Sequence, residues 1–279
     1  MKEKDSTLLI ESEKGFVLTP YVENICQKCL SYLKSGYPIH LTGLPGTGKT
    51  TLALYLAGLL EHPVLLLIGN EGFTLSGIIE NNNDPIFRSF SKTEESLKEP
   101  IKKACRDGYT LVYDNFSCSP SWVNNLLLSI FEDGILNQPN KCVQRGWNVK
   151  KHPDFHAILT SNSEENTENK IPLNSLYDRM ITIRLGHYDY DTESAIVRAK
   201  TGIRTEDAGR IVDIVRAARK SGNSVTIRAG IALGRILVAQ KAKIQPDDPV
   251  LLESCADVLG FDINGNGKAR QIVERALST

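Results

Sequence analysis

The stretch that most constrains the fold runs from Ile39 to Ala53 and reads IHLTGLPGTGKTTLA. Within it, Gly43 to Thr50 matches the phosphate-loop pattern G-x-x-x-x-G-K-[ST] without a gap. A short apolar segment, Tyr37 to Leu41, precedes the pattern, and good helix formers with apolar residues at helical spacing follow it from Thr50 to Leu60. The context predicts a buried strand, a phosphate-binding loop and a helix in direct succession.

The residue types of this loop suit a triphosphate, which carries several negative charges in a small volume. Gly46 and Gly48 let the backbone turn sharply and point successive N–H groups into a concavity. The following helix adds the positive end of its dipole, Lys49 can reach the β- and γ-phosphates, and the Thr50 hydroxyl can hold Mg²⁺. We expect ATP to be bound by Gly43, Pro45, Gly46, Thr47, Gly48, Lys49, Thr50 and Thr51. The alternative is a glycine-rich turn that only joins a strand to a helix.

Composition indicates a soluble globular chain, and the length suggests about two domains. The 279 residues are 41% hydrophobic and 24% charged, and 33 Lys plus Arg balance 33 Asp plus Glu. A net charge of zero gives no support for binding to nucleic acid. No apolar run approaches the length of a membrane span and no secretory signal is recognised, so we expect a cytoplasmic chain without a membrane partner.

The six cysteines are scattered along the chain, which fits a reduced cytosolic protein. Cys26 and Cys29 form a C-x-x-C pattern inside a predicted helix, without a second Cys or His pair at metal-binding spacing. Metal or redox use of this pair stays open as the alternative.

Further apolar segments predict an α/β fold, with a five-stranded parallel sheet flanked by helices. Besides the strand before the loop, the predicted strands are His62–Ile68, Gly108–Asp114, Phe155–Thr160 and Met180–Leu185. The predicted helices are 19–34, 93–106 and 119–131. The stretch 70–83 is interpreted as a helical turn followed by a loop, and 134–150 as a β-hairpin.

Polar residues stand at the carboxyl ends of two predicted strands, where ligands of parallel α/β sheets bind. Asp114 ends one strand, so we expect it to point toward the same Mg²⁺ as Thr50, although an aspartate there could instead begin a turn. Asn162 follows another strand and can reach the γ-phosphate or the attacking water, although asparagine also favours turns.

The pattern changes after Gly186, where strands give way to helices. Four helical segments are predicted, at about 191–201, 204–221, 226–243 and 248–259. We therefore predict a flexible N-terminus over 1–15, a phosphate-loop α/β domain over 16–188 and a small all-helical lid domain over 189–279.

This order of motifs resembles the AAA+ ATPases, over roughly residues 16–260. The resemblance implies that Asn162 is sensor 1, that Arg179 is the arginine finger and that Arg228 is sensor 2. Arg179 would then complete the site of a neighbouring subunit in a homo-oligomeric, hexameric ring. The alternatives are a salt bridge of Arg179 with Asp178 or a surface position, and simple solvation of Arg228. The predicted hairpin before the sensor strand resembles that of the MoxR-like branch.

Several separated segments also resemble the gas vesicle protein GvpN family. They are FVLTPYV from Phe16, YLKSGYPIHL from Tyr32, TLVYD from Thr110, LTSNSEE from Leu159, LYDRMITI from Leu176 and HYDYDTE from His187. This resemblance implies a cytosolic ATPase that promotes the growth of gas vesicles, working as a ring on the vesicle shell or on its assembly factors.

The chain departs from the family pattern at one position, because Asp114 is followed by Asn115 where the family has glutamate. That glutamate polarises the attacking water, whereas an amide can orient a water but cannot accept its proton. We expect binding to survive and hydrolysis to be slow, with Asp114, Asn115, Asn162, Arg179 and Arg228 as the catalytic set; Glu132 is a poor substitute base. The alternatives are a nucleotide-gated switch with little turnover and a MoxR-type chaperone for an unrelated partner.

Overall fold

The computed structural model describes residues 16–69, 74–79, 94–119, 121–138, 147–162, 175–260 and 266–277. The N-terminus predicted to be flexible, residues 1–15, lies outside this description. The described chain divides into two units. The first contains Phe16, Asn24–Leu44 and Gly48–Leu185, and the second contains Val17–Glu23, Pro45–Thr47 and the chain from Gly186 onward.

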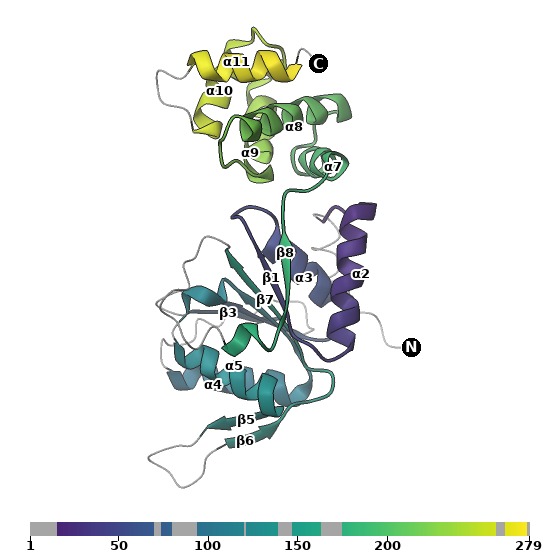
Figure 1. Ribbon diagram of the computed structural model, residues 1–279, viewed down its shortest axis with the longest axis vertical. Coiled ribbons are helices and arrows are strands. Elements are labelled where there is room, and N and C mark those ends of the chain that lie inside the picture. The colour runs from purple at the N-terminus through teal and green to yellow at the C-terminus, as the bar shows by residue number, and fades with distance from the viewer. Residues whose placement is uncertain are drawn as a thin grey trace. The chain divides into compact units, whose positions relative to one another are not determined.

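The first unit is built around a six-stranded sheet with the order β3-β2-β4-β7-β1-β8. Figure 1 labels β3, β7, β1 and β8 of this sheet. All neighbouring pairs except β2–β3 are parallel. The parallel strands are β1 (Ile39–Gly43), β2 (Val64–Ile68), β4 (Thr110–Asp114), β7 (His156–Asn162) and β8 (Ile181–Leu185). The predicted five-stranded parallel sheet is thus confirmed, and its carboxyl edge carries the phosphate loop, Asp114 and Asn162.

The sixth strand corrects one sequence interpretation. β3 (Thr74–Ile79) pairs antiparallel with β2 at the edge of the sheet, where a helical turn and a loop were predicted. The prediction was wrong for 74–79, because the conformation of an edge strand is decided by pairing with its neighbour more than by its own sequence. Residues 70–73 and 80–83 lie outside the described parts of the chain.

Helices cover both faces of this sheet. They are α2 (Pro20–Lys34), α3 (Lys49–Leu59), α4 (Glu94–Asp107) and α5 (Ser121–Asp133). Right-handed crossovers between parallel strands place α3 on one face, and α4 and α5 on the other. On the α4–α5 face, Leu65, Leu111 and Leu159 of the strands pack in one buried cluster with Ile101 of α4 and Leu127 of α5.

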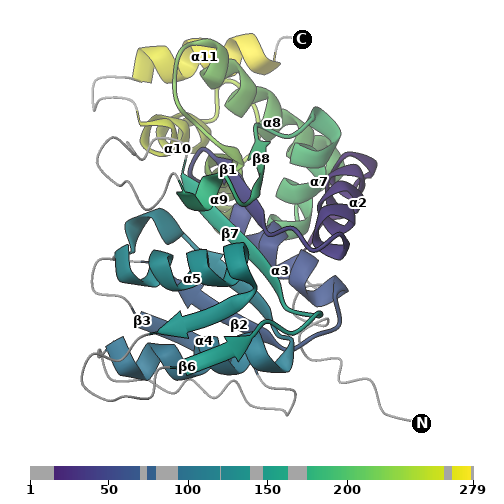
Figure 2. The ribbon, with the colours of Figure 1, turned by 60° about the horizontal axis from the view of Figure 1, so that its bottom comes forward.

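The hairpin predicted over 134–150 is also confirmed. β5 (Ile135–Gln138) and β6 (Trp147–Lys150) pair antiparallel, beside α4 and α5 (Figure 2). The Lys151 N–H donates to the Gly134 carbonyl at 2.7 Å and closes the base of the hairpin. Its turn, residues 139–146, lies outside the described residues.

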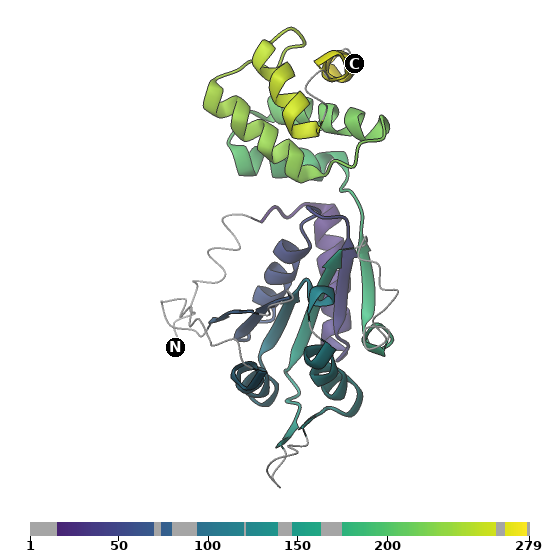
Figure 3. The same cartoon turned by 90° about the vertical axis from the view of Figure 1, so that its left-hand side faces the viewer.

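From Gly186 onward the second unit is helical, and Figure 3 shows its helices in green to yellow. The four predicted segments are present as α7 (Tyr190–Thr201), α8 (Thr205–Lys220), α9 (Ile227–Gln240) and α10 (Pro249–Leu259). A further helix, α11 (Asn266–Leu277), was not predicted. Glycine early in that segment weakens the helical signal, but its buried stripe has helical spacing: Ala269, Ile272, Val273 and Ala276.

A buried ion cluster in the second unit joins α7, and the residues just before it, to α8. The carboxylate of Glu193, 1% exposed, lies 2.8 Å from Arg216 Nε and 2.6 Å from Arg219 Nη2. Arg216 also donates to the Tyr188 carbonyl at 3.0 Å, and its guanidinium lies 5.3 Å from the centre of the Tyr190 ring. Three of these residues belong to the HYDYDTE segment, so the cluster gives that segment a packing role.

The cysteine pair on α2 is buried: Cys26 is 3% exposed and Cys29 is 0% exposed. Burial raises the pKa of the Cys29 thiol to about 12, which disfavours the thiolate that metal binding or disulfide exchange requires. Within the described residues, no group of three or more His, Cys, Asp or Glu is placed to hold a metal ion. None of the described helices is long and apolar enough to cross a membrane.

Candidate nucleotide-binding site

The phosphate loop joins β1 to α3, as the sequence predicts. Gly46 and Gly48 have φ values of +83° and +82°, in the left-handed region that glycine adopts without strain. Gly48 is the N-cap residue of α3, and no side chain caps this end of the helix. The first N–H groups of α3 and the positive end of its dipole therefore face the loop, as an anion site requires.

The Lys49 side chain lies inside the loop and is 7% exposed. Its ammonium donates to the carbonyl oxygens of Gly43 at 3.0 Å and Leu44 at 2.9 Å. A buried ammonium needs such partners. These two carbonyls hold the positive charge beside the loop, where a phosphate oxygen could replace them as acceptor.

The structure brings together the two predicted Mg²⁺ ligands. The Thr50 hydroxyl donates to Asp114 Oδ1 at 2.6 Å, although 64 residues separate them in the chain. Because the proton of Thr50 points to the carboxylate, lone pairs of its oxygen remain for a cation. Hydroxyl and carboxylate oxygens are the hard ligands that Mg²⁺ prefers, so the pair fits this ion.

Asn115 and Asn162 are also neighbours. The Asn162 side-chain amide donates to Asn115 Oδ1 at 3.2 Å, and Asn115 Nδ2 donates to Cys118 Sγ at 3.1 Å. Asn115 has φ +57° and ψ +42°, a left-handed conformation in which asparagine is enriched among non-glycine residues. The two amides form a polar pair beside the end of β4, and neither of them can act as a carboxylate base.

Arg179 is held by Glu132. Its Nη2 lies 2.5 Å from Glu132 Oε1, and its Nη1 donates to the Ser175 carbonyl at 2.8 Å. This pairing differs from the alternative of a salt bridge with Asp178. It also places the Glu132 carboxylate, at the end of α5, in an ion pair.

Arg228 is the second residue of α9, in the second unit, which also contains the tip of the phosphate loop, Pro45–Thr47. Within this unit, a Cβ atom built on Gly46 would lie 2.4 Å from Thr226 Oγ1 and 3.3 Å from the Cβ of Arg228. The close approach requires glycine at position 46. The role of Arg228 as sensor 2 stays a prediction.

Sequence reasoning missed two residues of this site. Thr160 donates to Asp114 Oδ1 at 2.6 Å, but a threonine inside a strand carries no sequence signal of its own. Gly69 donates its N–H to the Asp114 carbonyl at 2.7 Å, and a Cβ atom there would lie 2.1 Å from the Asn115 carbonyl oxygen. Glycine is needed here for close packing, which only the three-dimensional arrangement reveals.

A second polar network crosses the sheet through His40. Its ring nitrogens lie 2.9 Å from Ser161 Oγ on β7 and 3.1 Å from Thr182 Oγ1 on β8. The ring also contacts the aromatic rings of Phe116 and Tyr177, with centroids 5.3 and 5.1 Å away. Burial lowers the pKa of His40 to about 4. The network ties β1, which leads into the phosphate loop, to the strand that carries Asn162.

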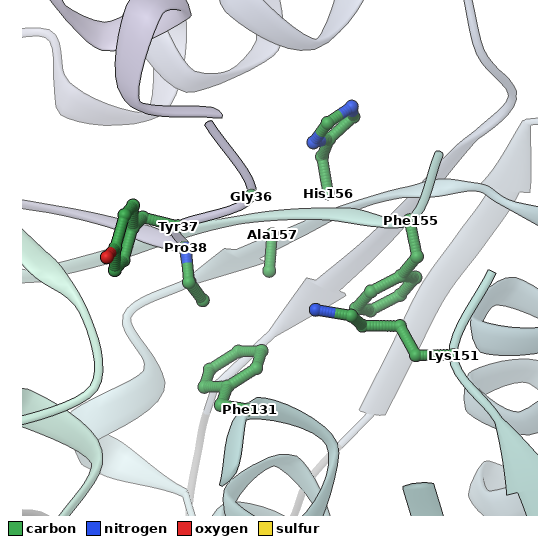
Figure 4. Close-up of a pocket in the computed structure, with 8 residues that line it drawn as sticks. All are labelled: Gly36, Tyr37, Pro38, Phe131, Lys151, Phe155, His156 and Ala157. Carbon is green, nitrogen blue, oxygen red and sulfur yellow. The ribbon is translucent and has the colours of Figure 1, made fainter. Parts of the chain in front are cut away.

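A small open hollow lies at the opposite edge of the sheet (Figure 4). It is lined by residues before β1 and at the start of β7, with Phe131 and Lys151 on its other sides. Because Asp114 and the phosphate loop follow the carboxyl ends of their strands, this hollow is not part of the nucleotide site.

Comparison with known proteins agrees with the geometry. Residues 38–180 match the model of the AAA domain of the dynein-related subfamily. The chain is 33% identical over 283 residues to the gas vesicle ATPase GvpN of Ancylobacter aquaticus, covering 96% of this chain and 79% of the relative. It is 32% identical over 287 residues to the gas vesicle ATPase GvpN of Haloferax mediterranei, covering 97% and 81%.

Among solved structures, the chain resembles the Thermotoga maritima RuvB Holliday junction branch migration motor, with a TM-score of 0.53 at 19% identity. The likeness covers 93% of this chain and 77% of that chain. At this identity the match concerns the fold alone. It supports an AAA+ arrangement of a phosphate-loop α/β part followed by a helical part.

Proposed function

The chain belongs to the gas vesicle ATPase GvpN family of AAA domain proteins, and we propose that it is a Mg²⁺-dependent ATP hydrolase that works as a hexameric ring to promote gas vesicle assembly or growth. As a member of this family it is an ATP-binding AAA+ protein and an ATPase. The observation that carries the proposed mechanism is the 2.6 Å hydrogen bond from Thr50 to Asp114. We place the protein in the cytoplasm, in association with gas vesicles.

The phosphate loop supplies the binding energy for ATP. The backbone N–H groups after Gly48 would donate hydrogen bonds to the phosphate oxygens, and Lys49 would exchange its two carbonyl acceptors for oxygens of the β- and γ-phosphates. The Thr50 hydroxyl and the Asp114 carboxylate would hold Mg²⁺, which when bound neutralises charge on the β- and γ-phosphate oxygens.

The polar pair of Asn115 and Asn162 would orient the attacking water. Both side chains can donate and accept hydrogen bonds, but neither can take up a proton at neutral pH. Losing a general base typically costs about 10²–10⁴ in rate. We therefore expect tight nucleotide binding combined with slow turnover.

Arg179 would act on the site of a neighbouring subunit. Its pairing with Glu132 and the Ser175 carbonyl keeps the guanidinium on its own subunit until a neighbour offers a γ-phosphate. An arginine finger is worth about 10³–10⁵ in rate. The exposed ion pair with Glu132 contributes at most about 1 kcal/mol, so Arg179 can exchange it for a γ-phosphate at little cost. Arg228 would contribute from the helical part as sensor 2.

A mixing experiment tests the ring. Lys49→Ala should abolish ATP binding and Arg179→Ala should abolish hydrolysis, whereas Lys220→Ala on the exposed part of α8 should change neither. Mixing the two inactive variants should restore activity, because Lys49→Ala subunits still supply Arg179 to the intact sites of Arg179→Ala subunits. No recovery on mixing, or activity per subunit that is independent of protein concentration, would refute the ring.

The gas vesicle role needs its own test. In cells that produce the remaining gas vesicle proteins, a gene carrying Lys49→Ala should give few or small vesicles, while Lys220→Ala should support normal buoyancy. Normal vesicles with Lys49→Ala would separate this chain's nucleotide chemistry from vesicle growth.

The second candidate is a nucleotide-gated switch with little turnover, favoured specifically by Asn115. Asn115→Asp restores a carboxylate, and aspartate also tolerates the left-handed conformation. In an ATPase that lacks only a base, this substitution should raise kcat by at least tenfold. If hydrolysis stays negligible while vesicle growth still requires ATP binding, the switch is the better description.

A further inference from the structure

Thr160, on β7, is buried between two pairs of site residues: Thr50 with Asp114, and Asn115 with Asn162. It is 1% exposed, and its hydroxyl makes two hydrogen bonds. It donates to Asp114 Oδ1 at 2.6 Å and accepts from the backbone N–H of Asn115 at 3.0 Å. One hydroxyl group therefore holds the side chain of one site residue and the backbone of the next.

The strand pairing explains why this hydroxyl is needed. β4 and β7 pair in register from Thr110 opposite His156 to Tyr113 opposite Leu159. The next positions, Asp114 and Thr160, follow the end of this ladder, because the chain turns at Asn115 into its left-handed conformation. Beyond the last backbone pair, the Thr160 hydroxyl accepts a hydrogen bond from the Asn115 N–H, which has no partner in the β4–β7 ladder.

The two hydrogen bonds to Asp114 converge on one oxygen. Thr50 and Thr160 both donate to Oδ1, each at 2.6 Å. Two donors from different elements, α3 and β7, fix both the position and the rotation of the carboxylate. Because Oδ1 is held by two donors, the carboxylate cannot rotate freely, and the position of Oδ2 is fixed as well.

We propose that Thr160 is a positioning residue that orients Asp114 toward the cation and holds Asn115 in place beside Asn162. This inference rests on the proposed function, in which Thr50 and Asp114 hold Mg²⁺. Both hydrogen bonds of the buried Thr160 hydroxyl go to Asp114 and Asn115. Thr160 acts through Asp114, the last residue of β4, and Asn115, the residue after it. Loss of its hydroxyl should therefore weaken Mg²⁺ binding more than nucleotide binding.

The chain provides a matched control at the other end of β4. Thr110 is also buried in the sheet, at 0% exposure, but its hydroxyl has no hydrogen-bond partner among the described residues. Replacing threonine by valine removes a hydroxyl and keeps the shape at both positions. Only at position 160 does the change remove bonds to the site.

The test compares Thr160→Val, Thr160→Ser and Thr110→Val in the full-length chain. Binding of a fluorescent ATP analogue is measured with EDTA and across a Mg²⁺ titration, together with kcat and KM for MgATP. For Thr160→Val we expect the Mg²⁺ concentration at half-saturation to rise and kcat to fall, each by about 10- to 100-fold. Binding in EDTA should stay within about threefold of the wild type.

Thr160→Ser keeps the hydroxyl and should restore both values to within about threefold, while Thr110→Val should match the wild type. A Thr160→Val chain that behaves like Thr110→Val, or a Thr160→Ser chain that behaves like Thr160→Val, overturns the positioning role. If Thr160→Val does not fold, Thr160→Ala takes its place, with the same expected rise in the Mg²⁺ half-saturation and with wild-type values overturning the positioning role. A wild type whose nucleotide binding and turnover ignore Mg²⁺ would instead overturn the proposed function, and the inference with it.

Discussion

Acidification tests how the first unit is packed around His40. This side chain is 3% exposed, lies on the strand that leads into the phosphate loop, and has a pKa lowered by burial to about 4. Both ring nitrogens face hydroxyl groups, which can accept as well as donate, so protonation does not force either hydrogen bond to break. The cost of protonation is therefore the burial of a charge.

The sign and size follow from linkage. The unfolded chain binds a proton at His40 with a pKa of about 6.5, whereas the folded chain binds it only near pH 4. Between these values the unfolded state holds more protons, so the stabilisation is complete above pH 6.5 and is lost as the pH falls toward 4. With these two pKa values, His40 alone costs about 2 kcal/mol on going from pH 7.5 to pH 5.

Scanning calorimetry of the full chain at pH 7.5 and pH 5 measures this loss. About 2 kcal/mol corresponds to a fall in Tm of roughly 4–8 °C for a unit of this size. Burial also lowers the pKa of His156 and His187, so the informative quantity is the difference between wild type and His40→Gln. The variant should start less stable and lose about 2 kcal/mol less on acidification. Equal losses of stability in the wild type and in His40→Gln would refute the reasoning.

Two further predictions concern stability and packing. Glu193→Gln leaves Arg216 and Arg219 without their buried countercharge and should lower the free energy of urea unfolding by about 3–5 kcal/mol. The control is Glu274→Gln, which removes an ion pair between Arg270, 59% exposed, and Glu274, 51% exposed. This control should lower the free energy of unfolding by less than about 1 kcal/mol. Gly69→Ala places a methyl group 2.1 Å from the Asn115 carbonyl oxygen and should cost about 1–3 kcal/mol together with most ATP hydrolysis. The matched change Gly267→Ala, in α11 with open space around it, should be neutral or stabilising; equal effects of the two alanines would contradict the packing argument.

The sequence was sufficient wherever a pattern had a single physical solution. Continuous apolar strands, a glycine-rich loop and an acidic strand end predicted β1, α3 and the meeting of Thr50 with Asp114, because parallel strands deliver their carboxyl ends to one edge. The hairpin followed from turn residues between two short segments. In each case the local signal and the long-range arrangement favour the same structure.

The sequence was insufficient wherever a neighbour decides the structure. β3 takes its conformation from pairing with β2, and the start of α11 contains glycine, so neither has a strong local signal. The partner of Arg179 is Glu132, 47 residues earlier, rather than the adjacent Asp178. Thr160 and Gly69 owe their roles to the end of β4, and no spacing rule connects them with it.

Asn115 shows how one residue can serve both local structure and chemistry. The backbone turns at this position with φ +57°, a conformation that favours asparagine or aspartate over longer side chains. The short amide then meets Asn162, and the backbone N–H meets Thr160. A glutamate would supply a carboxylate but would have to adopt the same left-handed backbone, whereas an aspartate supplies a carboxylate in a conformation that it tolerates. The slow hydrolysis that we expect and the tight turn after β4 would thus have one origin, and Asn115→Asp is the substitution that separates them.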